Sequence, residues 1–451
     1  MLHTFRKGGV HPPESKLTAS EKIVPVELPR EVVITFAQHI GAPAKCELKK
    51  GDHVNRGDLV AAAGGFVSAN VHASISGTVT KIDKYKTALG IPVDTVTITA
   101  DEEDHKRDIE AIAALKPLRS DEEIAALDSK ALVAIIDGAG IVGLGGATFP
   151  TKVKLSPPPG STAEVLIINA VECEPYLTND HALMLECPDE IIVGVQLLMK
   201  AAGVERAIIG IEANKGNAID LLTAKAAAAD SRIEVMGLKV KYPQGGEKQL
   251  IDATIGKEVP SGALPIATGA IVQNVATAYA VYEAVKFGKP LIERVVTVTG
   301  PSVAKPGNYR AAIGINMKEL IDVAGGVPAD TGKIILGGPM MGKSVVQIDA
   351  PTVKGTSGIL MLPEKEAVRN KVEPCIRCAS CVSACPMGLE PYLISTLSRL
   401  GRWEEVEEAK VMNCIECGCC SFICPSTRPI LDFIRLGKTT VGGIIRARQQ
   451  K

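Results

Sequence analysis

Eight cysteines in the C-terminal part of the chain have the spacing of iron–sulfur ligands. Two runs of the form C-x2-C-x2-C-x3-C-P lie at residues 375–386 and 414–425. A [4Fe–4S] cube takes one thiolate per iron, and in two-cluster ferredoxins of this spacing the fourth cysteine binds the other cluster. The spacing therefore predicts two cubes, one bound by Cys375, Cys378, Cys381 and Cys424, the other by Cys414, Cys417, Cys420 and Cys385.

Structural zinc and disulfides are the alternative uses of these cysteines. Zinc sites usually take separated C-x2–4-C pairs, whereas each run here begins with three closely spaced cysteines. We therefore favour clusters. The helical spacing of apolar residues in 393–400, between the runs, predicts a helical ferredoxin-like domain. The remaining cysteines, expected to be small buried residues, are Cys46, Cys173, Cys187 and Cys419.

The composition indicates a globular protein of several domains. Apolar residues make up 46% of the 451 residues, enough for a sizeable core. A net charge of −1 disfavours a nucleic-acid partner, because a phosphate-binding surface needs a basic excess. We expect neither a secretory signal nor a membrane span, since no apolar run has the length and flanks of either. Cysteines clustered at ligand spacing indicate a reducing compartment.

Hydrophobic periodicity divides the chain into units. Residues 121–290 alternate between strand and helix patterns, which predicts βαβ units and a largely parallel sheet. The remaining boundaries follow changes in composition. They are an extended N-terminal segment (1–29), β-rich hairpin units (30–100), a charged, solvated linker (101–120), a second β-rich unit (291–355), the cysteine region (365–435) and a basic C-terminal tail (436–451).

Iron–sulfur cubes move one electron at a time, whereas NADH delivers two as hydride. A flavin can accept the hydride and release the electrons singly, so a flavin and nucleotide site is expected. The candidate is GLGGATFPTKVKL, residues 143–155, whose glycines let backbone N–H groups approach a phosphate. A tight turn would explain these glycines about as often.

Polar residues follow the next predicted strand. Asn169, Glu172 and Glu174 would lie at its carboxyl end, where ligands bind in open α/β sheets. These carboxylates could accept hydrogen bonds from ribose hydroxyls or from the nicotinamide amide. A strand-end turn with solvated acids is an equal alternative.

Four motifs resemble the NADH/FMN subunit of respiratory complex I: GLGGATFPTKVKL, NAVECEPY, YPQGGEKQL and IVQNVAT. From TFRKGGVHPPE to the cysteine runs, the chain is similar to the RnfC family, which belongs to the Rnf ion-translocating electron-transport complex. The resemblance implies a multidomain α/β fold. Its parts would be an N-terminal barrel-sandwich hybrid of biotinyl/lipoyl type (30–100), a Rossmann-like NADH/FMN-binding domain (121–290), an SLBB β-grasp domain (291–355) and a helical two-cluster ferredoxin domain (365–435).

The resemblance also implies residue roles. The glycines would cradle FMN and nucleotide, the aromatic ring would stack near nicotinamide or adenine, and the lysine would lie near flavin or phosphate. One asparagine would contact FMN, and in NAVECEPY Glu174 would hold NADH, with Glu172 nearby. The implied cofactor-binding residues are Gly143, Gly145, Gly146, Phe149, Lys154, Asn169, Glu172, Glu174, Gly245, Glu247 and Asn274.

Three positions depart from the complex I pattern. Thr148 replaces a glycine, Gly246 a glutamate and Gln273 an asparagine. These departures weaken the FMN assignment more than the NADH assignment. The barrel-sandwich also lacks a lysine at its expected tip, residues 64–73, which favours a scaffold or docking role over a swinging carrier arm.

The implied function is that of an electron-input subunit. It would be an NADH:ferredoxin-type oxidoreductase that takes hydride from NADH through FMN and passes electrons through two [4Fe–4S] clusters, coupled by the complex to ion translocation. Its partners would be other Rnf subunits, including the cluster-carrying RnfB and the membrane subunits, and ferredoxin indirectly. We expect a peripheral protein at the cytoplasmic side of the bacterial cell membrane. The alternatives are a soluble relative, such as a cobalamin reductase, and an iron–sulfur scaffold without nucleotide chemistry.

Overall fold

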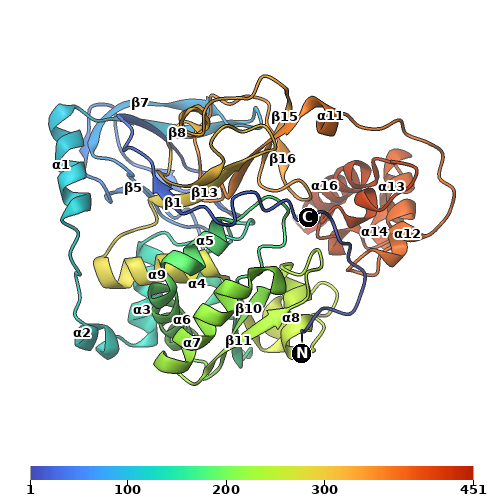
Figure 1. Cartoon of the computed structure of the whole chain (residues 1–451), viewed down its shortest axis with the longest axis horizontal. Coiled ribbons are helices and arrows are strands. Elements are labelled where there is room, and N and C mark those ends of the chain that lie inside the picture. The colour runs from blue at the N-terminus through green and yellow to red at the C-terminus, as the bar shows by residue number, and fades with distance from the viewer. Residues whose placement is uncertain (1, 450–451) are drawn as a thin grey trace.

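A computed structural model describes residues 2–449. Four sheets and a helical C-terminal region form the molecule. In Figure 1 the blue N-terminal and orange β-rich units lie above the green α/β unit, and the red cysteine domain lies to one side. Among the described residues, no helix is both long and apolar enough to cross a bilayer.

Two small sheets form the first β-rich unit, in the orders β2-β8-β7-β4 and β3-β5-β6. Alternating side chains of β2 and β8 point between the sheets, where Ile34, Val96 and Ile98 are fully buried. The unit is therefore a two-layer sandwich with its own core, as predicted. Its strands are β2 (Glu31–Thr35), β3 (Lys45–Cys46), β4 (His53–Val54), β5 (Leu59–Ala62), β6 (Val71–His72), β7 (Gly77–Lys86) and β8 (Pro92–Thr99).

The charged segment after this sandwich is exposed along most of its length, but it is helical. It forms helix α1 (Glu102–Ala113), capped by Asp101, followed by the short α2 (Asp121–Ala126). Asp108 is buried and accepts hydrogen bonds from the backbone N–H and hydroxyl of Ser76, both at 2.6 Å. Two of its acids, Asp104 and Asp108, turn inward to polar groups of the sandwich, so the helix also packs against that unit.

A four-stranded parallel sheet carries the α/β unit, in the order β11-β10-β9-β12. Successive strands run outward from β9 to β11, and the chain then returns to place β12 on the other side of β9. This reversal makes the carboxyl ends of β9 and β12 a topological switch point, where open α/β sheets bind ligands. The strands are β9 (Val165–Asn169), β10 (Ala207–Glu212), β11 (Ile233–Leu238) and β12 (Ala270–Asn274).

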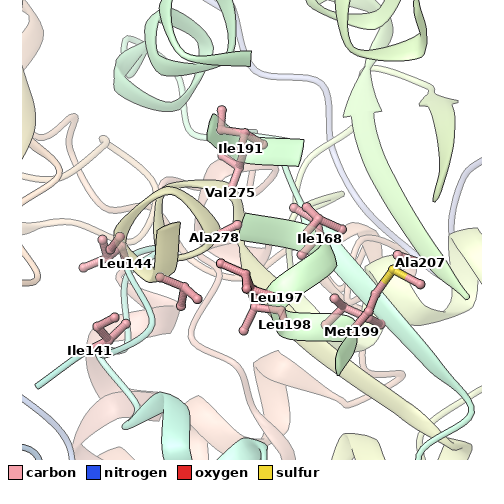
Figure 2. Close-up of a cluster of buried hydrophobic side chains, with 14 of the residues drawn as sticks. Ile141, Leu144, Ile168, Ile191, Leu197, Leu198, Met199, Ala207, Val275 and Ala278 are labelled. Carbon is pink, nitrogen blue, oxygen red and sulfur yellow. The ribbon is translucent and has the colours of Figure 1, made fainter. Parts of the chain in front are cut away.

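Helices cover both faces of this sheet. Figure 2 shows Ile168 of β9 in one buried cluster with Leu197 and Leu198 of α6 and Val275 and Ala278 of α9. The helices are α3 (Ser129–Gly138), α4 (Thr151–Lys154), α5 (Asn179–Glu186), α6 (Pro188–Ala202), η1 (Ala213–Lys215), α7 (Gly216–Ala229), α8 (Glu247–Ile255), η2 (Pro265–Thr268) and α9 (Val275–Phe287).

The second β-rich unit is a six-stranded mixed sheet, in the order β1-β14-β13-β17-β15-β16. Its edge strand β1 comes from the N-terminal segment, which pairs in parallel with β14. The segment is therefore extended, as predicted, but it is part of a sheet. The elements are β1 (Ile23–Pro25), β13 (Glu293–Thr299), β14 (Gly307–Ala312), α10 (Met317–Val323), β15 (Thr331–Leu336), β16 (Lys343–Ser344), β17 (Gly358–Pro363) and α11 (Glu364–Ala367).

The cysteine region is helical, as the periodicity between its two runs predicts. Ile394 and Val406 are fully buried against Ile434 of the last helix. That helix extends through the described part of the predicted basic tail. The elements are α12 (Ser380–Ser383), α13 (Pro391–Arg399), α14 (Trp403–Glu408), η3 (Val411–Asn413), α15 (Cys419–Phe422) and α16 (Ile430–Gln449).

The contact between α6 and α9 depends on a glycine. A Cβ added at Gly194 would lie 2.0 Å from the carbonyl oxygen of Ala278. We expect Gly194→Ala to lower the free energy of unfolding by about 1–3 kcal/mol, the usual cost of overpacking a core. Urea unfolding followed by circular dichroism would measure it. Gly216→Ala is the control, because a Cβ there meets no atom within 4 Å. Equal effects of both changes would contradict the close contact.

Candidate functional site

The two strands of the switch point end in asparagines. Asn169 of β9 and Asn274 of β12 are register partners. The Nδ2 of Asn274 donates to the carbonyl oxygen of Asn169 at 3.4 Å and to Asp180 at 2.7 Å, while its Oδ1 caps α9. A Cβ at Gly145 would lie 3.3 Å from this Nδ2. The glycine loop (residues 143–149) therefore packs directly on the switch point.

The glycine loop turns several backbone N–H groups away from the protein. The N–H of Gly143 donates to Phe149 O at 2.8 Å, and that of Leu144 to Thr277 Oγ1 at 3.0 Å. The next three, of residues 145–147, donate to no acceptor among residues 2–449, and all three residues are exposed. Successive unpaired N–H groups form an anion-binding concavity. The donor set fits a phosphate.

Two other predicted residues complete this patch. The Nδ2 of Asn169 donates to the carbonyl oxygen of Gly245 at 2.8 Å. The side chain of Lys154, at the end of α4, forms an ion pair with Glu247 of α8 at 2.6 Å and donates to Val272 O at 2.9 Å. Four motifs distant in sequence therefore meet at one edge of the sheet.

The two acids of the NAVECEPY motif bind elsewhere. Glu172 accepts hydrogen bonds from the N–H groups of Asp180 at 2.7 Å and His181 at 3.3 Å, in the first turn of α5. Glu174 accepts from Met340 N at 3.0 Å and Met341 N at 2.7 Å. In the described residues, their hydrogen bonds go to α5, Tyr242 and the loop between β15 and β16, and none goes to the glycine loop.

Burial raises the pKa of two carboxyl groups near the switch point. Burial raises the pKa of Glu174, although the N–H groups of Met340 and Met341 oppose that rise. Burial, with the neighbouring charge of Glu172, raises the pKa of Asp180 to about 7. Sequence reasoning missed Asp180, because nothing in its local pattern signals that it will contact Asn274.

A polar cavity of about 230 Å³ lies at the carboxyl ends of β10 and β11, beside the switch point. Burial raises the pKa of Glu212 in its wall to about 7. Lys16 of the N-terminal segment also lines it, and its Nζ donates to the carbonyl oxygens of Glu172, Glu174 and Leu177. The N-terminal segment thereby covers one side of this edge of the α/β sheet.

Five cysteines from both runs line a single cavity in the C-terminal domain. They are Cys385 of the first run and Cys414, Cys417, Cys419 and Cys420 of the second. All four predicted ligands of one cluster are among them, including the exchanged fourth cysteine, and Cys419 is the additional one. The lining therefore includes four thiol donors of the kind that a [4Fe–4S] cube takes.

The two cysteine sets differ in their surroundings. Cys417 and Cys420 are buried, and the neighbouring Cys419 contacts the carbonyl oxygen of Tyr242 in the α/β unit at 3.9 Å. Cys375 and Cys378, of the other set, are exposed. The set that contains Cys417 and Cys420 therefore lies against the α/β unit. The set that contains Cys375 and Cys378 reaches the surface.

Family models match the chain in four consecutive parts. They are the RnfC barrel sandwich hybrid domain (3–103), the Nuo51 FMN-binding domain (136–283), the SLBB domain (295–344) and a 4Fe-4S dicluster domain (365–425). Fold and site thus define a multidomain protein of the iron–sulfur electron-transfer class, with an α/β domain of the nucleotide-binding type.

Three relatives show to which family the chain belongs. The chain is 44% identical to the C subunit of the proton-translocating ferredoxin:NAD(+) oxidoreductase complex of Clostridium ljungdahlii, over 97% of this chain and 94% of that protein. It is 43% identical to the C subunit of the Na(+)-translocating complex of Acetobacterium woodii, over 97% of each. It is 40% identical to the C subunit of the ion-translocating oxidoreductase complex of Rhodobacter capsulatus, over 90% of this chain and 77% of that protein. The chain belongs to the RnfC family of Rnf-type ion-translocating oxidoreductase complexes.

The shared cavity predicts the effect of removing Cys385. Chains purified without oxygen should contain about eight irons, two cubes, from the ligand rule for this motif. Cys385→Ala should damage the cube bound mainly by Cys414, Cys417 and Cys420, because Cys385 faces those residues. Electron paramagnetic resonance of the reduced chain, compared with Cys417→Ala, would check this. Loss of only the cube of Cys375, Cys378 and Cys381 would contradict the assignment.

Proposed function

We propose that this chain is the electron-input subunit of a membrane-bound, ion-translocating NADH:ferredoxin-type oxidoreductase. The observation that carries the proposal is the joint placement of two sites. A loop with three unpaired N–H groups lies at the switch point, and a cavity whose lining includes the four predicted ligands of one cluster lies against the same α/β unit. The named activities of the Clostridium ljungdahlii and Acetobacterium woodii complexes support it.

FMN, when bound, accepts hydride and releases electrons one at a time. The residues at the switch point suit its phosphate: the glycine loop offers N–H donors, and the side chains of Asn169 and Asn274 hold the neighbouring strand ends in place. Lys154 provides a cation beside them, already paired with Glu247. We assign Phe149 and the glycines of the loop to the same site.

For Glu172 and Glu174 we propose roles in shaping the site, in place of direct contact with NADH. Because the carboxylate of Glu174 is held by Met340 and Met341, it links the α/β unit to the loop between β15 and β16. Glu172 fixes the start of α5. We propose that both shape the NADH-binding edge, Glu174 by fixing the loop that covers it.

We further propose an order for the clusters. The cube of Cys385, Cys414, Cys417 and Cys420 would receive electrons, since these residues lie against the α/β unit. The cube of Cys375, Cys378, Cys381 and Cys424 would deliver them, since Cys375 and Cys378 are exposed. The acceptors would be other Rnf subunits, including the cluster-carrying RnfB, at the cytoplasmic side of the cell membrane, with ferredoxin reached indirectly.

The finer domain assignment belongs to the same proposal. The α/β unit has the strand order of half a Rossmann fold, which supports that name for residues 121–290. We keep the barrel-sandwich hybrid for 30–100, the β-grasp domain for 291–355 and the helical ferredoxin domain for 365–435. The named relatives do not favour a soluble cobalamin reductase or a scaffold without nucleotide chemistry.

Lys154→Ala should weaken flavin retention. A hydrogen bond to a charged group contributes about 1.5–3 kcal/mol, roughly a tenfold to hundredfold change in affinity. Flavin released by acid from the purified chain, divided by its iron content, would measure the loss. Lys152→Ala on the same short helix is the control, because its partner is Asp137. Equal flavin content in both variants would remove Lys154 from the site.

Cys420→Ala should separate hydride uptake from electron delivery. The α/β unit keeps its structure in this variant, so NADH should still bleach the flavin absorbance. The electrons should not pass to an external acceptor, with transfer falling at least tenfold, because the receiving cube has lost a ligand. Stopped-flow absorbance of the isolated chain would follow both events. A wild-type chain without flavin bleaching would support the scaffold alternative instead.

A further inference from the structure

Two buried cations lie behind the glycine loop. Arg294 of β13 is 5% exposed, and Lys354, in the segment before β17, is 1% exposed. The guanidinium of Arg294 donates to Leu144 O at 2.6 Å and to Lys354 O at 2.7 Å. The Nζ of Lys354 donates to Gly140 O and to Asn70 O, both at 2.6 Å. One cation therefore binds inside the loop, and the other binds just before it.

Neither cation has a counter-charge at contact distance among residues 2–449. Burial alone lowers the pKa of Lys354 to about 7, and no neighbouring charge offsets it. Asp180 is the one carboxylate whose charge acts on Arg294, and burial raises the pKa of Asp180 itself to about 7. Buried charges in proteins are normally paired, because an uncompensated one is costly. The region thus contains two buried cationic side chains whose hydrogen bonds go to backbone carbonyl oxygens, where an anion bound nearby would favour their charged forms.

The hydrogen bonds to Arg294 also set the direction of the loop amides. In a trans peptide the C=O and the following N–H point in opposite directions. Because Leu144 O points inward to Arg294, the N–H of Gly145 points away from Arg294, and the N–H groups of Gly146 and Ala147 are unpaired as well. Holding the carbonyl therefore fixes the direction of the Gly145 donor.

We propose that Arg294 and Lys354 are positioning residues that fix the glycine loop and supply the buried positive charge for the phosphate of a nucleotide cofactor. The inference rests on the proposed function, which places such a cofactor at this loop. The nitrogens of both side chains are directed at carbonyl oxygens, so they act through the loop without touching the phosphate. The phosphate is either the monoester of FMN or the diphosphate of a dinucleotide.

This assignment gives the second β-rich unit a part in nucleotide binding. Arg294 and Lys354 both belong to that unit, and Asn70 belongs to the N-terminal sandwich. Leu144 and Gly140 belong to the α/β unit. The loop is thus held by side chains from outside its own domain, and its shape depends on how the three units pack together.

The test compares ligands with and without phosphate on the full-length chain, prepared without oxygen and stripped of flavin. Binding of FMN and of riboflavin would be measured by quenching of flavin fluorescence, and binding of ADP-ribose by calorimetry. The variants are Arg294→Gln and Lys354→Met. The control is Arg310→Gln, a largely buried arginine on the neighbouring strand β14, whose side chain lies against the ring of Tyr279.

We expect both variants to bind FMN at least tenfold more weakly and riboflavin unchanged, with Arg310→Gln like the wild type. Loss confined to ADP-ribose would assign the charge to the diphosphate of the dinucleotide and also support the proposal. Arg294→Lys, which keeps the charge, should recover most of the FMN affinity and guards against a misfolded Gln variant. Iron content serves as the folding check.

Unchanged affinity for both phosphate ligands would overturn the inference, and so would equal weakening of FMN and riboflavin, which would indicate general damage to the loop. A wild-type chain that binds neither FMN nor ADP-ribose would instead contradict the proposed function. The two failures are therefore distinguishable.

Discussion

Cationic side chains bound to backbone carbonyl oxygens hold the units of this chain together. Lys16, Arg294 and Lys354 each donate to carbonyls of irregular segments that have no strand partner of their own. An ammonium has three donors, so Lys16 satisfies three carbonyls at the edge of the α/β sheet at once. Buried carbonyls without hydrogen-bond partners would cost free energy. The long cationic side chains remove that cost where no neighbouring strand can donate to these carbonyls.

The N-terminal segment extends this principle across the molecule. Its strand β1 completes the six-stranded sheet, and Lys16 binds beside the α/β edge. Further toward the N-terminus, the N–H of Gly9 donates to Ala384 O in the cysteine domain. A Cβ at Gly8 would lie 2.5 Å from the backbone of Cys385, so only glycine allows this approach. A segment with little regular structure thus connects three units and reaches the backbone of a proposed cluster ligand.

Short-range sequence patterns predicted those features of the fold that depend on residues close together in the chain. The cysteine spacing led to a set of four residues that the structure gathers around one cavity, and the periodicity of 393–400 predicted the region of α13. The βαβ alternation predicted the parallel sheet. These features depend on neighbours within one element or one motif, which the sequence displays directly.

Long-range contacts were out of reach of the same reasoning. Lys354 and Gly140 are 214 positions apart, and Glu174 and Met340 are 166 apart. No local pattern distinguishes Lys354 from an exposed lysine, so its burial follows only from the packing of three units. The inward-facing acids of α1 could not be predicted for a related reason. The composition of the segment is that of a solvated one, and most of it is exposed, but Asp108 accepts hydrogen bonds from Ser76 of the sandwich.

The substitution at Thr148 shows how such packing maintains the glycine loop. Thr148 stands where the complex I pattern has a glycine, and its φ of 51° is a left-handed conformation that costs a non-glycine residue about 1–2 kcal/mol. Contacts from two other units hold it there. Its carbonyl accepts a hydrogen bond from Ile40 of the sandwich at 3.4 Å.

Its methyl group lies against Gly355, directly after Lys354. A Cβ at Gly355 would be 2.8 Å from the Cγ2 of Thr148. The side chain gained in the loop is thus accommodated by the absence of one in the covering segment. Because the backbone at Thr148 keeps the conformation that a glycine would adopt, this departure from the family pattern does not by itself argue against a phosphate at residues 145–147.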